Sequence, residues 1–177
     1  MLAFINQIYS ATFYFWFVHI GFAAGGNFNY VGSGTNYLCL PRDPQFSDGS
    51  HAVSASFTNY IYGAEYETNF FGDKSADQDV PCAVCQSTAG TNILMIPGRL
   101  TCYQGWTRQY KGFLSSNYYG YKGQSEYVCV EENAEYLFGG EKSTNGALFY
   151  PTIFACGTLQ CPPYKNDEPV TCVVCSK

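Results

Sequence analysis

Two stretches of this chain, Pro81-Cys82-Ala83-Val84-Cys85 and Thr171-Cys172-Val173-Val174-Cys175, share the pattern Cys-x-Val-Cys. Each follows a second matching segment. Tyr37-Leu38-Cys39-Leu40 precedes the first stretch, and Tyr127-Val128-Cys129-Val130 precedes the second. In both places, 43 residues separate the cysteine of the upstream segment from the first cysteine of the Cys-x-Val-Cys stretch.

A third pair of matching blocks lies further upstream. Gly21-Phe22-Ala23 and Gly112-Phe113-Leu114 precede Cys39 and Cys129 by 18 and 17 residues. Three matched blocks in the same order predict that the chain is a tandem duplication. The two halves differ in their cysteines, because the second half has six and the first has three. The cysteines without a counterpart in the first half are Cys102, Cys156 and Cys161.

The repeat divides the chain into three expected parts. Residues 1–19 form an atypical apolar start, residues 20–88 a first, incomplete subdomain, and residues 89–177 a second, complete six-cysteine subdomain; the two subdomains join around Gln86–Thr91. The apolar run Ala11–Gly26 fits a secretory signal, a strand of the fold or a misplaced start. It is shorter than the roughly 20 apolar residues of a membrane-spanning helix, so no membrane span is expected.

The composition narrows the class of protein. Apolar residues make up 46% of the 177 residues and charged residues 13%, which excludes intrinsic disorder. The net charge of −5, with only 9 Lys plus Arg, argues against a nucleic-acid partner. The 16 Tyr, 14 Phe and 18 Gly favour short strands and turns over helices. Nine cysteines are typical of a secreted protein, and their odd number leaves one outside any set of internal pairs.

The expected fold is all-β, with two tandem, similar, β-rich and disulfide-bonded subdomains. Apolar and β-branched segments separated by Gly, Asn and Pro predict the strands. They are Ala52–Phe57, Asn59–Tyr66, Asn92–Ile96, Thr107–Leu114, Glu126–Glu131, Leu148–Phe154 and Val170–Val174.

The cysteines are expected to form disulfides. Cys156 and Cys161 are five residues apart with a glycine between them, and we expect them to pair with each other. In the first half, Cys39 can form a disulfide with either Cys82 or Cys85. Spacing alone does not decide between these two pairs.

The second half leaves the same choice open. Cys129 is expected to pair with Cys172 or Cys175, and Cys102 is expected to pair with whichever of these two cysteines remains. In the chain-entropy model, a bridge that closes a loop of this length stabilises the fold by about 4 kcal/mol.

Zinc binding is a second interpretation of the same cysteines. Cys82, Cys85, Cys172 and Cys175 would supply four thiolates to a tetrahedral site. The two Cys-x-x-Cys pairs are 90 residues apart, much further than in a zinc ribbon, and five cysteines would remain unexplained. A redox Cys-x-x-Cys site is a third interpretation, but the valines around both pairs favour a strand over the helix N-terminus that such a site needs. We therefore expect no metal site and no cofactor.

The second half carries an ordered set of cysteine, glycine and aromatic motifs. They are Cys102-x-x-Gly105-Trp106, Tyr110-x-Gly112-Phe113, Cys129, Cys156, Cys161 and Cys172-x-Val174-Cys175. Together these motifs resemble a known family, the C-terminal non-collagenous domain of type IV collagen. Other blocks are more similar to the spongin-type short-chain collagens of invertebrates and to proteins like them. These blocks are Asn36-Tyr37-Leu38-Cys39-Leu40-Pro41, Tyr62-Gly63-Ala64-Glu65-Tyr66, Asn145-Gly146-Ala147-Leu148 and Cys161-Pro162-Pro163-Tyr164. The resemblance covers roughly residues 20–177.

The resemblance implies a disulfide pattern and an arrangement of the subdomains. In the collagen domain the first cysteine of a subdomain pairs with the last, the second with the fifth and the third with the fourth, and the two subdomains pack about a pseudo-two-fold axis. Carried over, this implies the pairs Cys102–Cys175, Cys129–Cys172, Cys156–Cys161 and Cys39–Cys82. Cys85 is then the cysteine left unpaired, available for a bridge to another chain. The chain has no Gly-X-Y run, so it cannot form a collagen triple helix as given.

Few residues suggest catalysis or ion binding. A Ser-His-acid triad would have to use His19 or His51, and neither follows a nucleophile motif, so we expect no enzyme. Carboxylates gather in two segments and offer oxygen ligands for Ca²⁺, although solvated loops are the better explanation of both. The segments hold Asp73, Asp77 and Asp79, and Glu131, Glu132 and Glu135.

Exposed aromatic residues offer a different chemistry. Tyr118, Tyr119 and Tyr121 surround Gly120, and Trp106 follows a glycine. Such rings can stack on sugars, although most Tyr and Trp serve packing. The sequence and the resemblance together imply a secreted, extracellular, non-enzymatic structural module of the matrix, with itself or other matrix chains as partners. The alternative is a secreted module that binds a glycan or calcium.

Overall fold

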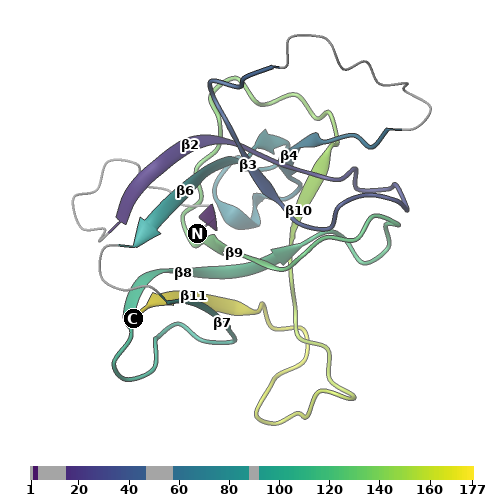
Figure 1. Cartoon of the computed structure of the whole chain (residues 1–177). Helices are drawn as coiled ribbons and strands as arrows, with labels where there is room; N and C mark the ends of the chain where they lie inside the picture. The colour runs from purple at the N-terminus through teal and green to yellow at the C-terminus, as the bar shows by residue number, and fades with distance from the viewer. Residues whose placement is uncertain (1, 4–14, 47–57, 88–91) are drawn as a thin grey trace.

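The computed structural model describes residues 2–3, 15–46, 58–87 and 92–177 (Figure 1). We call the residues up to 88 the first half and residues 89–177 the second half. The described residues form strands, loops and one short 3-10 turn at Asn69–Phe71. The all-β prediction is confirmed. The strands are β1 (Leu2–Ala3), β2 (Phe15–Gly25), β3 (Leu38–Pro41), β4 (Tyr62–Tyr66), β5 (Gln78–Asp79), β6 (Pro81–Ser87), β7 (Ile93–Pro97), β8 (Thr107–Ser116), β9 (Val128–Glu131), β10 (Ala147–Pro151) and β11 (Thr171–Ser176).

The eleven strands belong to one curled sheet. Its hydrogen-bonded path runs β1-β6-β2-β4-β10-β8-β11-β7, while β3, β5 and β9 pair with β2, β4 and β8. The path crosses from the first half to the second at β4 and β10, which pair in parallel with Ala64 opposite Ala147. The curl places β2 and β6 on one side of the molecule and β8 and β11 on the other (Figure 1).

The strand that carries each matched sequence block has the same place in the path, whichever end of the path is the starting point. From one end it reads β1-β6-β2-β4 with β3 beside β2, and from the other β7-β11-β8-β10 with β9 beside β8. The registers also agree with the sequence blocks. Gly21 lies opposite Cys82 of β6, and Gly112 lies opposite Cys172 of β11. Each matched block of the sequence therefore occupies the same position in its own half.

Glycine is required at the two equivalent positions. A Cβ atom at Gly21 would overlap the carbonyl oxygen of Leu40, and a Cβ atom at Gly112 would overlap the carbonyl oxygen of Val130. Only a residue without a side chain allows β3 and β9 to approach β2 and β8 this closely.

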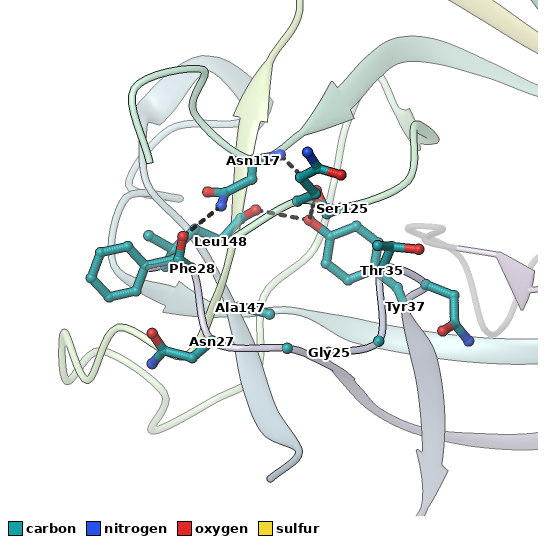
Figure 2. A pocket seen from close by; sticks show the side chains of 13 residues that line it. Gly25, Asn27, Phe28, Thr35, Tyr37, Asn117, Ser125, Ala147 and Leu148 are labelled. Carbon is teal, nitrogen blue, oxygen red and sulfur yellow. Dashed lines mark hydrogen bonds between the residues drawn. The ribbon is translucent and has the colours of Figure 1, made fainter. Parts of the chain in front are cut away.

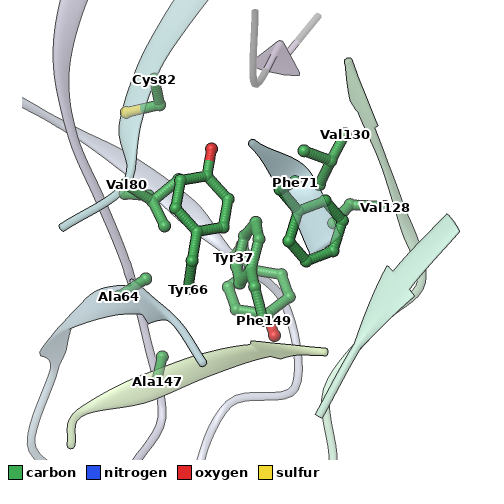
Figure 3. Close-up of a cluster of buried hydrophobic side chains, with 11 residues drawn as sticks. Tyr37, Ala64, Tyr66, Phe71, Val80, Cys82, Val128, Val130, Ala147 and Phe149 are labelled. Carbon is green, nitrogen blue, oxygen red and sulfur yellow. The ribbon is translucent and has the colours of Figure 1, made fainter. Parts of the chain in front are cut away.

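Both halves contribute to the main core. Tyr37, Tyr66 and Phe71 of the first half pack against Val130 and Phe149 of the second (Figure 3). The ring centroids of Tyr37 and Phe149 are 4.5 Å apart, and those of Tyr66 and Phe149 are 5.9 Å apart. Edge-to-face packing at these distances adds stability beyond burial alone.

The predicted strands agree unevenly with the observed ones. Four predictions in the second half match β7, β8, β9 and β11 to within two residues at each end, and the predicted Leu148–Phe154 ends earlier, as β10 at Pro151. The predicted Asn59–Tyr66 is shorter, as β4. The predicted Ala52–Phe57 lies outside the described residues. Strands β1, β3, β5 and β6 were missed.

The apolar N-terminal run contains a strand of the sheet. Strand β2 begins at Phe15, five residues before the expected start of the first subdomain at residue 20, and pairs with β6 from Phe15 to Phe22. The sequence of this run fits a secretory signal, a strand of the fold or a misplaced start, and over Phe15–Gly25 the structure shows a strand. In the described part of the chain, no helix is long and apolar enough to cross a membrane.

Candidate functional site

Four disulfides link eight of the nine cysteines. Their Cα–Cα distances lie between 5.7 and 6.0 Å, within the usual range. The pairs are Cys39–Cys82, Cys102–Cys175, Cys129–Cys172 and Cys156–Cys161, the same four that the resemblance implies. Three sulfurs of the alternative zinc site, those of Cys82, Cys172 and Cys175, are therefore bonded to other sulfurs and are not thiolates.

Cys85 keeps its thiol and lies inside the molecule. Its exposed fraction is 2%, and it packs in a core cluster with Tyr110, Leu114 and Cys172 of the second half. Burial raises the pKa of the thiol, which lowers its reactivity. The expectation that Cys85 is available for a bridge to another chain is wrong for this fold, because another molecule cannot reach the sulfur.

The tyrosines of the 118–121 loop form an aromatic cluster with a strand residue. We call Tyr118, Tyr119, Tyr121 and Tyr150 of β10 the tyrosine cluster. The ring of Tyr118 is central: its centroid lies 4.5 Å from that of Tyr119, 5.2 Å from that of Tyr121 and 5.5 Å from that of Tyr150. Phe28 of the first half packs edge-to-face on Tyr121 at 4.7 Å. Most of these rings pack on each other, but Tyr119 is 92% exposed.

Hydrogen bonds fix the loop that carries the tyrosine cluster. The Asn117 side-chain amide donates to the carbonyl oxygens of Phe28 (2.9 Å) and Gly123 (2.8 Å), and its backbone N–H donates to Ser125 Oγ (2.9 Å) (Figure 2). The Tyr121 N–H donates to the Tyr118 carbonyl oxygen at 3.1 Å and closes the turn. The loop is therefore held at both ends and against the other half.

The junction beside this loop is closed to larger molecules. The Tyr37 hydroxyl donates to the Leu148 carbonyl oxygen (2.9 Å) and lies 3.2 Å from Ser125 Oγ, while the Tyr37 N–H donates to Glu126 (2.8 Å) (Figure 2). The cavity among these residues has a volume of about 10 Å³, room for roughly one water molecule. Burial raises the pKa of Tyr37 to about 12. The residues at this junction serve to join the two halves.

A larger groove lies beside the segment that carries the Cys156–Cys161 disulfide, between residues 96–103 and 163–171. This segment is the yellow-green loop that extends below β7 and β11 in Figure 1. The volume of the groove is about 720 Å³. The Arg99 guanidinium lies 4.5 Å from the ring centroid of Tyr103 on one wall, and the rings of Phe154 and Tyr164 are 5.1 Å apart on another. Lys165 adds a second cation to the lining, and Glu168 adds one carboxylate. The groove combines flat aromatic faces with two cations and one anion.

The sequence drew attention to Trp106 but not to this groove. Trp106 is half-buried against Val173 and Cys175, so its role is packing. The groove residues come from three separate segments, and the signal that was available was the density of aromatic and basic residues around the Cys156–Cys161 pair and after β7.

The carboxylates that the sequence offered as calcium ligands do not form a metal-binding cluster in the part of the chain that the structure describes. Among the described residues, no three His, Cys, Asp or Glu side chains are placed to hold a metal ion. The best-bonded carboxylate, Glu65, was not predicted. It is buried in β4 and accepts hydrogen bonds from the Thr144 N–H (2.8 Å), the Thr144 hydroxyl (2.6 Å) and the Asn145 N–H (3.2 Å). Glu65 therefore fixes the segment that leads into β10.

The histidines have separate surroundings. His19 Nε2 lies 3.0 Å from the Cys39 carbonyl oxygen, a contact between β2 and β3. His51 lies outside the described residues.

No protein-family model matches this chain, and no solved structure matches it.

Proposed function

We propose that this chain is a non-enzymatic, extracellular structural module of the matrix, of the kind found at the C-terminus of collagens. Two arguments support the proposal. The order of cysteine and glycine motifs resembles that family, and the four disulfides have the pairing that the resemblance implies. Four disulfides are also typical of proteins that fold in an oxidising compartment.

We propose further that the two halves arose by duplication. The strand path that reads alike from either end supports this, as do the equivalent registers of Gly21 and Gly112. The pseudo-two-fold relation between the halves belongs to the same proposal.

Assembly through strand β7 is the activity that we assign to the module, with a second copy of the chain as the partner. The observation that supports this most directly is that β7 ends the sheet path and, among the described residues, pairs with β11 alone. Strand β7 has the sequence Ile-Leu-Met-Ile-Pro without a charge, and Ile93 and Leu94 are 38% and 40% exposed. An uncharged, apolar edge strand is a template for pairing with another strand, which natural monomers normally block with charge. Two β7 strands related by a two-fold axis would continue the sheet and cover these side chains.

Sedimentation of the purified, oxidised chain over a range of concentrations tests the assembly. We expect a dimer for the natural sequence and a monomer for Leu94→Lys, because a lysine on each copy places like charges at the pairing edge. Val31→Lys changes an equally apolar, exposed residue away from the edge and serves as the matched control. A monomer at high concentration for the natural sequence, or an unchanged dimer for Leu94→Lys, contradicts the proposal. A larger assembly formed only with another matrix chain would replace the second copy as partner.

A second candidate function, glycan binding, is favoured by the groove between residues 96–103 and 163–171, beside the Cys156–Cys161 loop. Arg99 and Lys165 would contact carboxylate or sulfate groups, and the Tyr103 and Tyr164 rings would stack on sugar faces. The ligand class is therefore an acidic oligosaccharide. The scattered carboxylates give no corresponding support to calcium binding.

Titration with sulfated and neutral oligosaccharides of equal length tests this candidate. We expect binding of the sulfated sugar alone, and its loss in Arg99→Gln and in Tyr103→Ala. Tyr136→Ala removes an exposed tyrosine that is not among the groove residues and is the control. Equal binding of all variants, or none by the natural chain, rejects the groove as a glycan site.

A further inference from the structure

We propose that Tyr119 is a site of oxidative tyrosine cross-linking, at which two copies of the chain are joined covalently through their rings. The proposal deepens the assembly function above and rests on it. Strand β7 runs in the same direction as β8, so an antiparallel β7 pair places its two 118–121 loops at opposite ends, and the cross-link joins copies from neighbouring dimers. The oxidant is a peroxide acting through a haem peroxidase.

The first argument is exposure. Tyr119 is 92% exposed, the highest fraction of any tyrosine in the described part of the chain. The carbons ortho to its hydroxyl must meet the same carbons of another ring, and a ring that stands almost free of its own chain can do so. Tyr37, Tyr66 and Tyr110 are buried and cannot.

The second argument is the neighbourhood of the Tyr119 ring. Tyr118 lies 4.5 Å away, and Tyr118 in turn lies 5.5 Å from Tyr150. Rings this close can exchange an electron, so a radical formed on any of them can reach Tyr119. Tyr119 is the member of the cluster whose ring another molecule can reach.

The third argument is that the loop is fixed. The Asn117 side chain bonds to Phe28 and Gly123, and the Tyr121 N–H closes the turn over Gly120. A ring presented from a fixed loop loses less conformational freedom when it is joined to another molecule.

The chemistry balances as follows. Each of two Tyr119 phenols loses one hydrogen atom, an electron and a proton, to the oxidised peroxidase. The two radicals form one carbon–carbon bond between ring carbons ortho to the hydroxyls, and the hydrogens on those carbons move to the oxygens and restore both phenols. The pair of chains loses two hydrogen atoms in total. One hydrogen peroxide accepts them and becomes two water molecules.

Treatment of the purified, oxidised chain with hydrogen peroxide and a haem peroxidase tests the proposal. Dimer is measured on a denaturing gel under reducing conditions, together with dityrosine fluorescence and mass mapping of the linked peptides. We expect a dimer with a linked 118–121 loop, and loss of most of that dimer in Tyr119→Phe. Tyr127→Phe removes another exposed tyrosine, at 58% exposure, outside the tyrosine cluster and should cross-link like the natural chain.

The same samples are sedimented before the oxidant is added. A natural chain that associates but gives no link at Tyr119, or a Tyr119→Phe variant that cross-links like the natural chain, overturns this proposal and leaves the β7 assembly standing. A chain that is monomeric before oxidation and cross-links only by collision overturns the assembly on which the proposal rests. Unchanged association of Tyr119→Phe before oxidation shows that the variant is folded.

Discussion

Strands β3 and β9 occupy the same position in the two halves, and their surroundings differ. Each pairs with the long strand of its half and carries the cysteine that is bonded to the Cys-x-Val-Cys strand. Leu38 of β3 is 44% exposed, whereas Val128 of β9 is 8% exposed. Phe71, in the 3-10 turn of the first half, packs with Val128 and Val130, so the first half covers β9. Equal backbone pairing therefore does not bring equal burial; the covering element decides it.

Strands β6 and β11, which carry the two Cys-x-Val-Cys stretches, also differ in what covers one of their faces. Ala83 and Cys85 of β6 pack into a core made mostly by the second half, while Val173 and Cys175 of β11 face a small cluster completed by Cys102 and Trp106. In the second half the Cys102–Cys175 disulfide holds this face, and in the first half side chains of the second half cover it. On this face, β11 is therefore held by a disulfide and β6 by packing.

Removal of the two equivalent disulfides is expected to have the largest effect. Replacing Cys129 and Cys172 with Ala should cost about 5 kcal/mol of unfolding free energy, about 4 kcal/mol for the cross-link and the rest for lost burial. Replacing Cys39 and Cys82 should cost about 4 kcal/mol, because Cys39 is less buried. Denaturant unfolding of both double variants measures the difference. A larger loss in the first half would show that burial does not separate the two bridges.

Alanine at the equivalent glycines is the next largest change. Gly21→Ala and Gly112→Ala should each cost about 3 kcal/mol or more, since the new methyl group meets a backbone carbonyl that cannot turn aside. Gly63→Ala, where a Cβ atom meets nothing within 4 Å, is the matched control and should be close to neutral. The three unfolding midpoints give the comparison. If either of the first two variants were as stable as the control, the close approach of the strands would be wrong.

The loss of stability at alkaline pH tests the burial of Tyr37, the tyrosine that precedes β3. Burial raises the pKa of Tyr37 to about 12, above its ordinary value near 10. The unfolded chain therefore loses this proton first, and stability from this group is complete below pH 10 and falls by about 2–3 kcal/mol as the pH rises to 12. We expect a shallower alkaline loss of stability for Tyr37→Phe than for the natural chain, followed by circular dichroism, and Tyr127→Phe, at a position that is 58% exposed, is the control for loss of a tyrosine hydroxyl. Equal curves for the two variants would contradict the buried position of Tyr37.

The smallest effect concerns Cys85. Cys85→Ala should cost about 1–2 kcal/mol, because it removes one small buried side chain from the shared core. An alkylating reagent should modify Cys85 of the natural chain only after denaturant is added. Rapid alkylation under native conditions would mean that the two halves separate at this face.

The sequence predicted most strands of the second half, and it missed β1, β3, β5 and β6, which pair with strands of their own first half. Strands β7, β8, β9 and β11 carry apolar or β-branched residues between turn residues, which is a local signal. Strand β6 has the same Cys-x-Val-Cys pattern as β11, and the repeat itself was the signal that would have found it. The parallel pair of β4 and β10 has no local signal, because its partners are brought together by the packing of the halves.

The candidate sites show the same limit. The tyrosines of the 118–121 loop were visible in the sequence, but their contact with Tyr150 and Phe28 depends on three separate segments. The burial of Cys85 follows from alternation along β6, where Cys82 faces one core and Cys85 the other. That alternation becomes readable only once β6 is recognised as a strand.

The parallel pairing of β4 with β10 has a consequence for synthesis of the chain. Ala64 and its partner Ala147 are 83 residues apart (147 − 64), so β4 leaves the ribosome long before β10 is made. Until β10 is made, β4 lacks the partner that it has in the finished sheet, and Ala64 and Tyr66, which the finished protein buries, lack part of their cover. Unpaired apolar edges are sites through which nascent chains aggregate. Closure of this part of the sheet therefore requires synthesis of the second half.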